Sequence, residues 1–304
     1  MEKIENIDKY IKDFLYVIEF GENKSLNTVK SIRKDLSQLS VYLKEIEKIT
    51  DVMEITSVML RGFLISLQDN NVGKRSLNRK LSSLRSFFKF LLKNGYIKNN
   101  PVEVIDSPSF EIEKPDILSI DEINRLRSVI DINNANGLRD RLMLELMYSS
   151  GITSVEMLKT GEQFFDLDKR ELLVFNGKNN RTVFFSERTR EFFKKYVEAK
   201  KIKYKDRYNP EILFVNGSGN RLSDRSLRRI VDRYAQRAKI AREISPYSFR
   251  HTFALHLLAK GMKINYLKEL MGHVTIESTK VYQDMLCIVP FDFMKATMRS
   301  EEKW

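Results

Sequence analysis

The sequence predicts a mainly helical protein with two domains, the second of which also contains a short antiparallel sheet. Apolar residues recur at helical spacing through the first 107 of its 304 residues. Three prolines within 15 residues, Pro101, Pro108 and Pro115, then interrupt any helix and indicate a linker over residues 108–116. Residues 171–187, ELLVFNGKNNRTVFFSE, hold two short apolar runs around Gly-Lys-Asn-Asn, a pattern that predicts a β-hairpin.

Four helices are expected in the first domain, residues 1–107. The first covers residues 6–18, NIDKYIKDFLYVI, where the apolar residues follow a helical period. The second begins at Ser25, whose hydroxyl suits an N-cap, and its apolar stripe consists of Val29, Ile32, Leu36, Leu39 and Leu43. A third helix is expected from Ser57 to Gln68, and a fourth from about Ser76 to Lys93, ending near Gly95.

The second domain is expected over residues 117–304. It begins with a helix, because Ser119 and Glu122 have the spacing of a capping box. Further helices follow the hairpin. One of them lies within residues 221–242, and its apolar stripe consists of Leu227, Ile230, Val231, Tyr234 and Ala238.

The composition narrows the classes of function. A net charge of +12 and a pI of about 9.5 suggest a polyanionic partner, although a basic surface that binds nothing is the alternative. Cys287 is the only cysteine, which excludes an intramolecular disulfide and a multi-cysteine metal site. Glycine-rich nucleotide-binding motifs are absent, and His251 and His256 lack the spacing of a two-histidine metal helix. Without an apolar leader or a run of about 18 apolar residues, a cytoplasmic protein is expected.

Two of the expected helices concentrate positive charge. Residues 74–98 contain eight Lys or Arg and no acidic residue, and residues 221–242 contain eight against two Asp. Serines stand between the basic residues of the first helix, a composition that suits phosphate oxygens, although an ordinary solvated face is the alternative. We therefore expect two basic helices that clamp a duplex with strong salt dependence. The candidate DNA-binding residues are Arg79, Lys89, Lys93, Arg225, Arg229 and Arg233.

Two ordered motifs lie near the C-terminus. Residues 245–261, SPYSFRHTFALHLLAKG, contain Arg250 and His251, and residues 271–282, MGHVTIESTKVY, contain His273, Thr279 and Tyr282. This order resembles the signature of the tyrosine recombinases, the phage-integrase and Xer family, in which His-x-x-Arg-His and Leu-Gly-His precede a terminal tyrosine.

Further segments extend the resemblance to residues 7–287. They are GLRDRLMLELMYSSGI, NGKNNRTVFF and SLNRKLSSLRSFFKFLLKNGYIKNNPV, which are similar to the family's first box, its lysine-bearing hairpin and its N-terminal core-binding domain. The resemblance implies a helical SAM-like first domain and a mixed α/β catalytic domain with the DNA breaking-rejoining fold.

The resemblance also implies a chemistry. Tyr282 would attack a DNA phosphodiester, form a 3′-phosphotyrosyl bond and release a 5′-hydroxyl, so that no ATP is needed. Arg250 would hold the non-bridging oxygens, His273 would hydrogen-bond the phosphate or assist proton transfer, and Lys178 would protonate the leaving oxygen. His251 would support the site from outside it. Neither a metal nor a cofactor is implied, because arginines neutralise the charge.

Two positions depart from the family pattern. Thr153 stands where the first catalytic arginine is expected, whereas the acidic residue of the same box, Glu156, is in place. Tyr247 stands at the leading histidine of the second box, and a tyrosine is a poor base, with a pKa of about 10. Lys159 and Arg181 are the nearby cations that could substitute for the missing arginine, but neither matches the motif position.

The expected partner is double-stranded DNA with a specific site, bound by a homo- or hetero-tetramer across two such sites. By resemblance, the residues after Tyr282 form a tail helix that docks into a neighbouring protomer; a tail that folds back on its own domain is the alternative. The apolar residues of this tail are Met285, Leu286, Ile288, Val289 and Phe291.

Two other functions remain open. Because of Thr153, the chain could be a catalytically impaired DNA-binding relative, a regulator or a silent partner; activity raised by Thr153→Arg would indicate an otherwise intact site. An RNA-binding protein has less support, because no strand motif rich in aromatic residues is visible.

Overall fold

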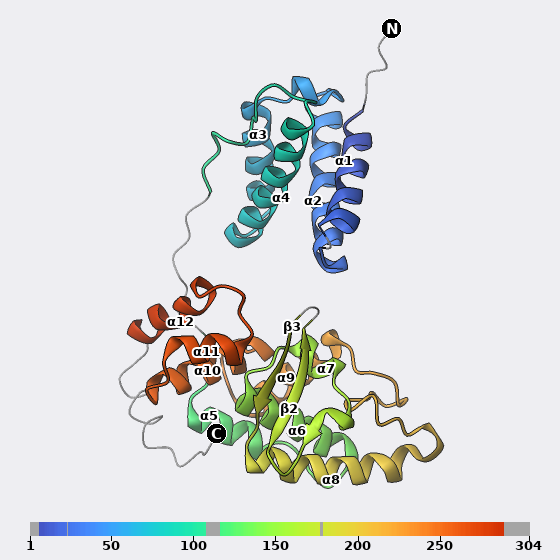
Figure 1. Cartoon of the computed structure of the whole chain (residues 1–304), viewed down its shortest axis with the longest axis vertical. Helices are drawn as coiled ribbons and strands as arrows, with labels where there is room; N and C mark the ends of the chain where they lie inside the picture. Colours follow the sequence, from blue (N-terminus) through green and yellow to red (C-terminus); the bar gives the residue numbers. More distant parts are fainter. Residues whose placement is uncertain (1–5, 23, 108–115, 177–178, 289–304) are drawn as a thin grey trace. The chain divides into compact units, whose positions relative to one another are not determined.

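The computed structural model describes residues 6–22, 24–107, 116–176 and 179–288. The chain divides into two compact units, residues 1–112 and 113–304 (Figure 1). Helices dominate both units, and the second contains a small antiparallel sheet. The predicted fold class is confirmed. The division falls inside the expected linker, of which residues 108–115 lie outside the described part.

The N-terminal unit contains the four predicted helices. Its helical segments are α1 (Ile7–Tyr16), a π-helical turn (Val17–Gly21), α2 (Leu26–Glu45), a 3₁₀ turn (Val52–Glu54), α3 (Ser57–Asp69) and α4 (Lys74–Lys93). Ser25 caps α2 by accepting the Thr28 N–H at 3.2 Å, as predicted. α4 begins two residues before the predicted Ser76 and is followed by Gly95 with a φ of 73°.

A buried carboxylate joins α2 to α4. Asp35 on α2 is 1% exposed and accepts hydrogen bonds from Arg79 (2.8 Å), Lys80 (2.9 Å) and Ser83 (2.8 Å) on α4. Burial alone would raise the pKa of Asp35, but these three partners hold it below its usual value. A charged Asp35 therefore fixes the register between the two helices.

The C-terminal unit contains a three-stranded sheet among helices. Its segments are α5 (Ile120–Ser128), α6 (Ala135–Ser150), α7 (Ser154–Lys159), a 3₁₀ turn (Glu162–Phe164), β1 (Phe165–Asp166), β2 (Glu171–Asn176), β3 (Asn179–Phe184), α8 (Glu187–Tyr204), a 3₁₀ turn (Lys205–Arg207), α9 (Asp224–Arg237), α10 (Pro246–Ala259), α11 (Ile264–Met271) and α12 (Glu277–Ile288). The predicted capping box of Ser119 and Glu122 opens α5. β2 and β3 form the predicted hairpin, in which Leu172 opposes Val183. β1 was not predicted, since it is only two residues long.

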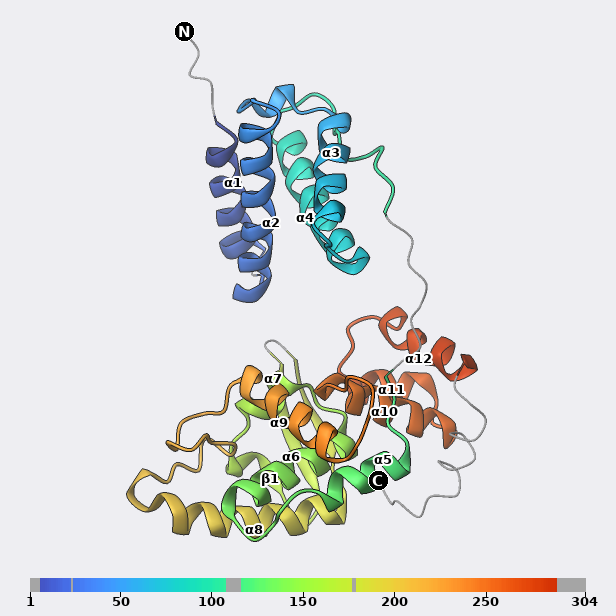
Figure 2. The ribbon, with the colours of Figure 1, turned by 180° about the vertical axis from the view of Figure 1, so that it is seen from behind.

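Two apolar clusters build this unit. The larger one lies among α5 to α9 and the sheet, and the smaller one joins α10, α11 and α12. Figures 1 and 2 show α10, α11 and α12 gathered together, with α8 running along the opposite side of the unit. α11 contacts β3 and α10 contacts α6, so the smaller cluster is held against both the sheet and the central helix.

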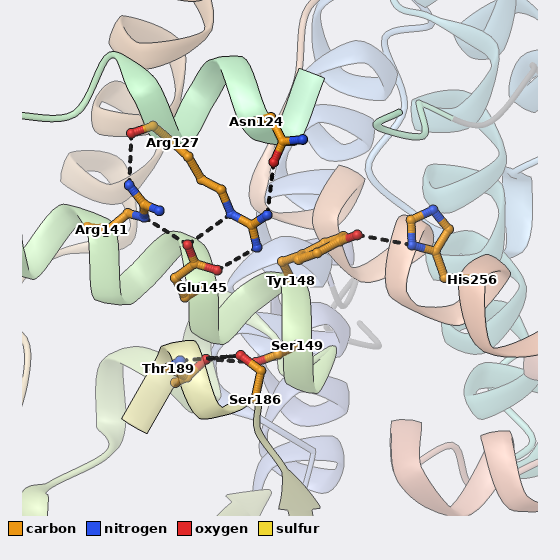
Figure 3. A network of polar contacts seen from close by, with 9 residues as sticks. All are labelled: Asn124, Arg127, Arg141, Glu145, Tyr148, Ser149, Ser186, Thr189 and His256. Carbon is orange, nitrogen blue, oxygen red and sulfur yellow. Dashed lines mark hydrogen bonds and ion pairs between the residues drawn. The ribbon is translucent and has the colours of Figure 1, made fainter. Parts of the chain in front are cut away.

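Buried charges in the larger cluster are satisfied by one another. Figure 3 shows Glu145 on α6 accepting from Arg127 of α5 at 2.9 and 2.8 Å and from Arg141 at 2.7 Å. On the far side of the same network, His256 is 1% exposed, with its Nδ1 3.4 Å from the Tyr148 hydroxyl. His256 therefore packs in the interior of the domain. In the described part of the chain, no helix is both long and apolar enough to cross a membrane.

Candidate active site

Three helices bring the motif residues together. α10 carries Tyr247, Arg250 and His251, the turn after α11 carries His273, and α12 carries Tyr282. Arg250 and Tyr282 are 6% and 5% exposed, so both face inward. Within the described ranges, no group of three or more His, Cys, Asp or Glu side chains is arranged to hold a metal ion.

Arg250 is a buried cation held by neutral groups. Its Nη1 donates to the Gly151 carbonyl at 2.5 Å and its Nη2 to the Met271 carbonyl at 2.6 Å. Gly151 directly follows α6 and Met271 ends α11, so both carbonyls belong to helix C-termini with partial negative charge. Arg250 makes no ion pair with any carboxylate among the described residues. Its positive charge is therefore available to an incoming anion.

Two glycines allow these helix ends to reach the arginines. Gly151 has a φ of 60°, and a Cβ there would lie 2.2 Å from Cδ1 of Phe253. Gly272 has a φ of 67°, and a Cβ there would lie 2.8 Å from Nη1 of Arg181. Both the left-handed conformation and the close approach therefore require glycine.

Tyr282 contacts two histidines. Its hydroxyl lies 3.2 Å from Nδ1 of His251, and its ring stacks on that of His273 with centroids 6.1 Å apart and an interplanar angle of 7°. Burial raises the pKa of Tyr282, and Arg250 opposes this only in part. The hydroxyl is therefore protonated at neutral pH, and it could act as a nucleophile only with a proton acceptor beside it. His251, expected to support the site from outside, instead touches the hydroxyl directly.

His273 is a neutral imidazole. Burial first, and then repulsion by Arg250 and Arg181, lower the pKa of His273 to about 4. Its Nε2 lies 3.2 Å from Nη2 of Arg250, and its Nδ1 lies 2.8 Å from the Thr279 hydroxyl. Because a guanidinium can only donate, Nε2 accepts and Nδ1 carries the proton that it donates to Thr279. His273 thus orients Arg250 without adding charge.

The side chain of Thr153 caps the helix that follows it. It is the N-cap of α7, where its Oγ1 accepts the Glu156 N–H at 3.3 Å and donates to Oε2 of Glu156 at 2.9 Å. The Thr153 N–H also donates to the same oxygen at 2.8 Å. The single hydroxyl proton of Thr153 is therefore directed at Glu156.

Arg181 on β3 lies in the site, although the motif gave it no place. Its Nη1 and Nη2 donate to the two oxygens of Glu156 at 2.5 and 3.1 Å. Burial alone would raise the pKa of Glu156, but Arg181 and Thr153 hold it below its usual value. A signal was present in the sequence: strand alternation puts Arg181 on the same face as buried Val183 and Phe185, where a charge requires a partner.

The remaining predicted residues lie at the edge of the site or outside the described part. Tyr247 is 45% exposed, with its ring 6.5 Å from that of His251. Lys159 is exposed at the end of α7. Lys178 lies outside the described residues, so its expected role as a proton donor stays a prediction.

The basic face of α4 borders a groove lined by hydroxyls. The groove, of about 460 Å³, lies between α2 and α4 and is lined by Asn27, Thr28, Ser31, Ile32, Arg79, Ser82, Ser83 and Ser86. Lys89 and Lys93 are exposed and make no ion pair within the described ranges, whereas Arg79 is tied to Asp35. Arg79 therefore has a structural task as well as its predicted contact with DNA.

The basic residues of α9 differ among themselves. Arg225 and Arg229 are exposed and form no ion pair in the described part of the chain. Arg233 instead pairs with buried Asp140 at 3.1 Å, and its guanidinium lies 5.0 Å from the centre of the Tyr234 ring. Of the three, Arg225 and Arg229 have the charge least engaged by the protein itself.

Comparisons with known proteins agree with the motifs. Residues 116–286 match the Phage integrase family, and residues 11–95 match the Phage integrase, N-terminal SAM-like domain. Tyrosine recombinase XerC of Thermodesulfovibrio yellowstonii is 34% identical over 283 residues, which cover 91% of this chain and 92% of that protein. Tyrosine recombinase XerD of Staphylococcus saprophyticus is 30% identical over 277 residues, 91% of this chain and 94% of that one.

A solved structure extends the agreement to the fold. XerH site-specific recombinase, in a post-cleavage complex with palindromic difH substrate, superposes with a TM-score of 0.73 at 20% identity, over 90% of this chain and 81% of that one. The resemblance stated from the motifs is confirmed. The chain belongs to the phage integrase family of tyrosine recombinases.

Proposed function

We propose that this chain is a site-specific DNA recombinase that cuts and rejoins DNA through a bond between Tyr282 and a 3′ phosphate. The observation that carries the proposal is the buried guanidinium of Arg250, which has neutral partners and no carboxylate among the described residues, in the same site as the Tyr282 hydroxyl. A buried cation without a counter-ion is energetically unfavourable until an anion binds to it, and a DNA phosphodiester is such an anion. The impaired DNA-binding relative is not favoured, since the relatives compared above are named recombinases.

The reaction is an exchange of one phosphoester for another. Tyr282 Oη attacks the phosphorus, its proton passes to Nδ1 of His251, and the bond from phosphorus to the 5′-oxygen breaks. Arg250 donates to the non-bridging oxygens as their charge grows, and neutral His273 holds its guanidinium in place. Lys178, by resemblance, gives the leaving oxygen its proton. A 5′-hydroxyl of the partner duplex then reverses the sequence, so that neither ATP nor a metal is required.

Both units take part in holding DNA. Exposed positive charges that no described acidic residue of the protein pairs with are supplied by Lys89 and Lys93 on α4 and by Arg225 and Arg229 on α9.

Recombination between two sites has four strands to cut, so a tetramer on two duplexes is the proposed assembly. In the part of the tail that the structure describes, Ile288 is 45% exposed and available to a neighbour. Met285 and Leu286 pack partly against their own domain, and Val289 and Phe291 lie outside the described residues.

Covalent trapping tests the proposal. The protein is mixed with nicked suicide duplexes that carry candidate sites from its own genome, in EDTA and without ATP, and adducts are resolved on a denaturing gel. The expected result is an adduct in the parent that is lost in Tyr282→Phe, a variant that keeps the ring and removes only the attacking oxygen. Tight binding to a site with no adduct from the parent would contradict the proposal and favour the DNA-binding relative.

A further inference from the structure

Negative charge grows on the non-bridging oxygens once the reaction begins, and of the groups discussed so far Arg250 is the one cation placed to donate to them. A phosphodiester carries one negative charge, and attack by a deprotonated tyrosine adds a second to the five-coordinate phosphorus. His273, with a pKa of about 4, adds no positive charge at neutral pH. The hydroxyl of Thr153 is directed at Glu156. The proton released by Tyr282 goes to His251, beside the attacking oxygen. A second charged donor near Arg250 would therefore still stabilise the non-bridging oxygens.

Arg181 is that neighbouring cation, and its position is fixed by the same short segment that fixes Arg250. Nε of Arg181 donates to the Leu270 carbonyl at 2.8 Å, and Nη2 of Arg250 donates to the carbonyl of the next residue, Met271, at 2.6 Å. Gly272 then approaches Arg181 again, and His273 contacts Arg250. Residues 270–273 thus contact both guanidinium groups. Burial lowers the pKa of Arg250, and the two arginines are near enough for the charge of Arg181 to lower it further.

Arg181 retains donors for a ligand. A guanidinium has five N–H groups, of which Arg181 directs one to Leu270 and two to Glu156. The other two N–H groups have no partner among the described residues. The Arg181 side chain is 11% exposed, so these donors lie in a partly desolvated site where a charged hydrogen bond is strong.

We propose that Arg181 is a catalytic residue that supplies the second phosphate-binding guanidinium of this site, in place of the arginine that Thr153 does not provide. Glu156 then serves as the holder of Arg181: it is 4% exposed and binds two of its nitrogens. Lys159, the other cation near the motif, is exposed at the end of α7 and is not needed. This inference rests on the proposed recombinase function and names a residue that performs it.

The test measures strand cleavage on paired substrates. The nicked duplex that gives an adduct with the parent is compared with the same duplex carrying a neutral methylphosphonate at the cleaved linkage. On the phosphodiester, Arg181→Gln is expected to slow cleavage by about 10²–10³-fold, the usual effect of losing a transition-state donor. On the methylphosphonate, which has one negative charge fewer to stabilise, we expect the loss to shrink to about 10-fold or less. Arg181→Lys keeps the charge, so its cleavage rate on the phosphodiester is expected to lie between those of the parent and Arg181→Gln.

Arg127→Gln is the matched control. It breaks another buried Arg–Glu pair of the same unit, the one in Figure 3, without touching the site. It is expected to cleave both substrates at parent-like rates below its unfolding temperature. Cleavage by Arg181→Gln at a rate close to the parent's would overturn the inference, and so would an equal loss on both substrates, which indicates only a structural pairing with Glu156. Each of these two results requires an adduct in the parent, so each leaves the recombinase function standing. The absence of an adduct in the parent would overturn the recombinase function and the role of Arg181 together.

Discussion

Glu156→Gln separates the charge of Glu156 from its role in the helix cap. Glutamine is accepted at this position of a capping box, so the N-terminus of α7 stays capped. The change removes the carboxylate from a pair whose side chains are 4% and 11% exposed, leaving Arg181 without its counter-ion. Breaking a buried pair on one side costs about 3–5 kcal/mol. At about 2–4 °C per kcal/mol for a unit of this size, the melting temperature should fall by roughly 6–20 °C.

Urea and thermal unfolding, followed by circular dichroism, measure this effect. Adding Arg181→Gln to Glu156→Gln should destabilise by less than the sum of the single changes, with a coupling of about 0.5–3 kcal/mol. Glu191→Gln is the control, because its pair with Lys195 is about half exposed on both sides and should matter by less than about 0.5 kcal/mol. A Glu156→Gln protein as stable as the Glu191→Gln protein, or strictly additive changes, would refute the account of this pair.

Three further predictions follow from the described contacts. The pKa of His273 is about 4 in the folded protein and near 6.5 in the unfolded chain. The unfolded chain therefore binds more protons between these pH values, so the free energy of unfolding should fall as the pH drops from 6.5 to 4. Urea unfolding measured across this range should show a weaker fall in His273→Gln. Lys89→Ala should weaken DNA binding and, in titrations at several salt concentrations, reduce the slope of log K against log salt concentration by about 0.9. Arg79→Ala should in addition lower the stability of the N-terminal unit, because the buried Asp35 on α2 loses a counter-ion. Thr153→Arg should raise the adduct rate by less than about 10-fold in the parent but by about 10²-fold in Arg181→Gln, where a missing donor is replaced.

Local patterns were sufficient to predict most of the fold. Helical periodicity located the four N-terminal helices, the caps at Ser25 and Ser119 were observed, and the runs around Gly-Lys-Asn-Asn formed β2 and β3. These features depend on residues within a turn or two of each other. β1 was not predicted because two residues are too few to show the alternating pattern of a strand, and because its pairing depends on β2.

The site was less predictable because its contacts join distant residues. Arg181 and Glu156 are separated by 25 residues, and His251 and Tyr282 by 31, so neither pairing follows from spacing along the chain. The same holds for Arg79, which was predicted to contact DNA and which binds Asp35, 44 residues away. The motifs supplied the candidates for the reacting groups, but the partners that set the charge and orientation of these candidates are visible only after folding.

Tyr282 is the proposed nucleophile, and the position of the covalent bond on the trapped protein decides whether it is. Protein trapped on a suicide duplex can be digested with protease and nuclease, and the peptide that carries the residual nucleotide identified by mass spectrometry. Tyr247 is the informative rival, since it is 45% exposed and its ring lies near His251, which also contacts Tyr282. We expect the nucleotide on Tyr282 in the parent and no adduct in Tyr282→Phe. A nucleotide on Tyr247 or any other residue, or an adduct that persists in Tyr282→Phe, would contradict this expectation.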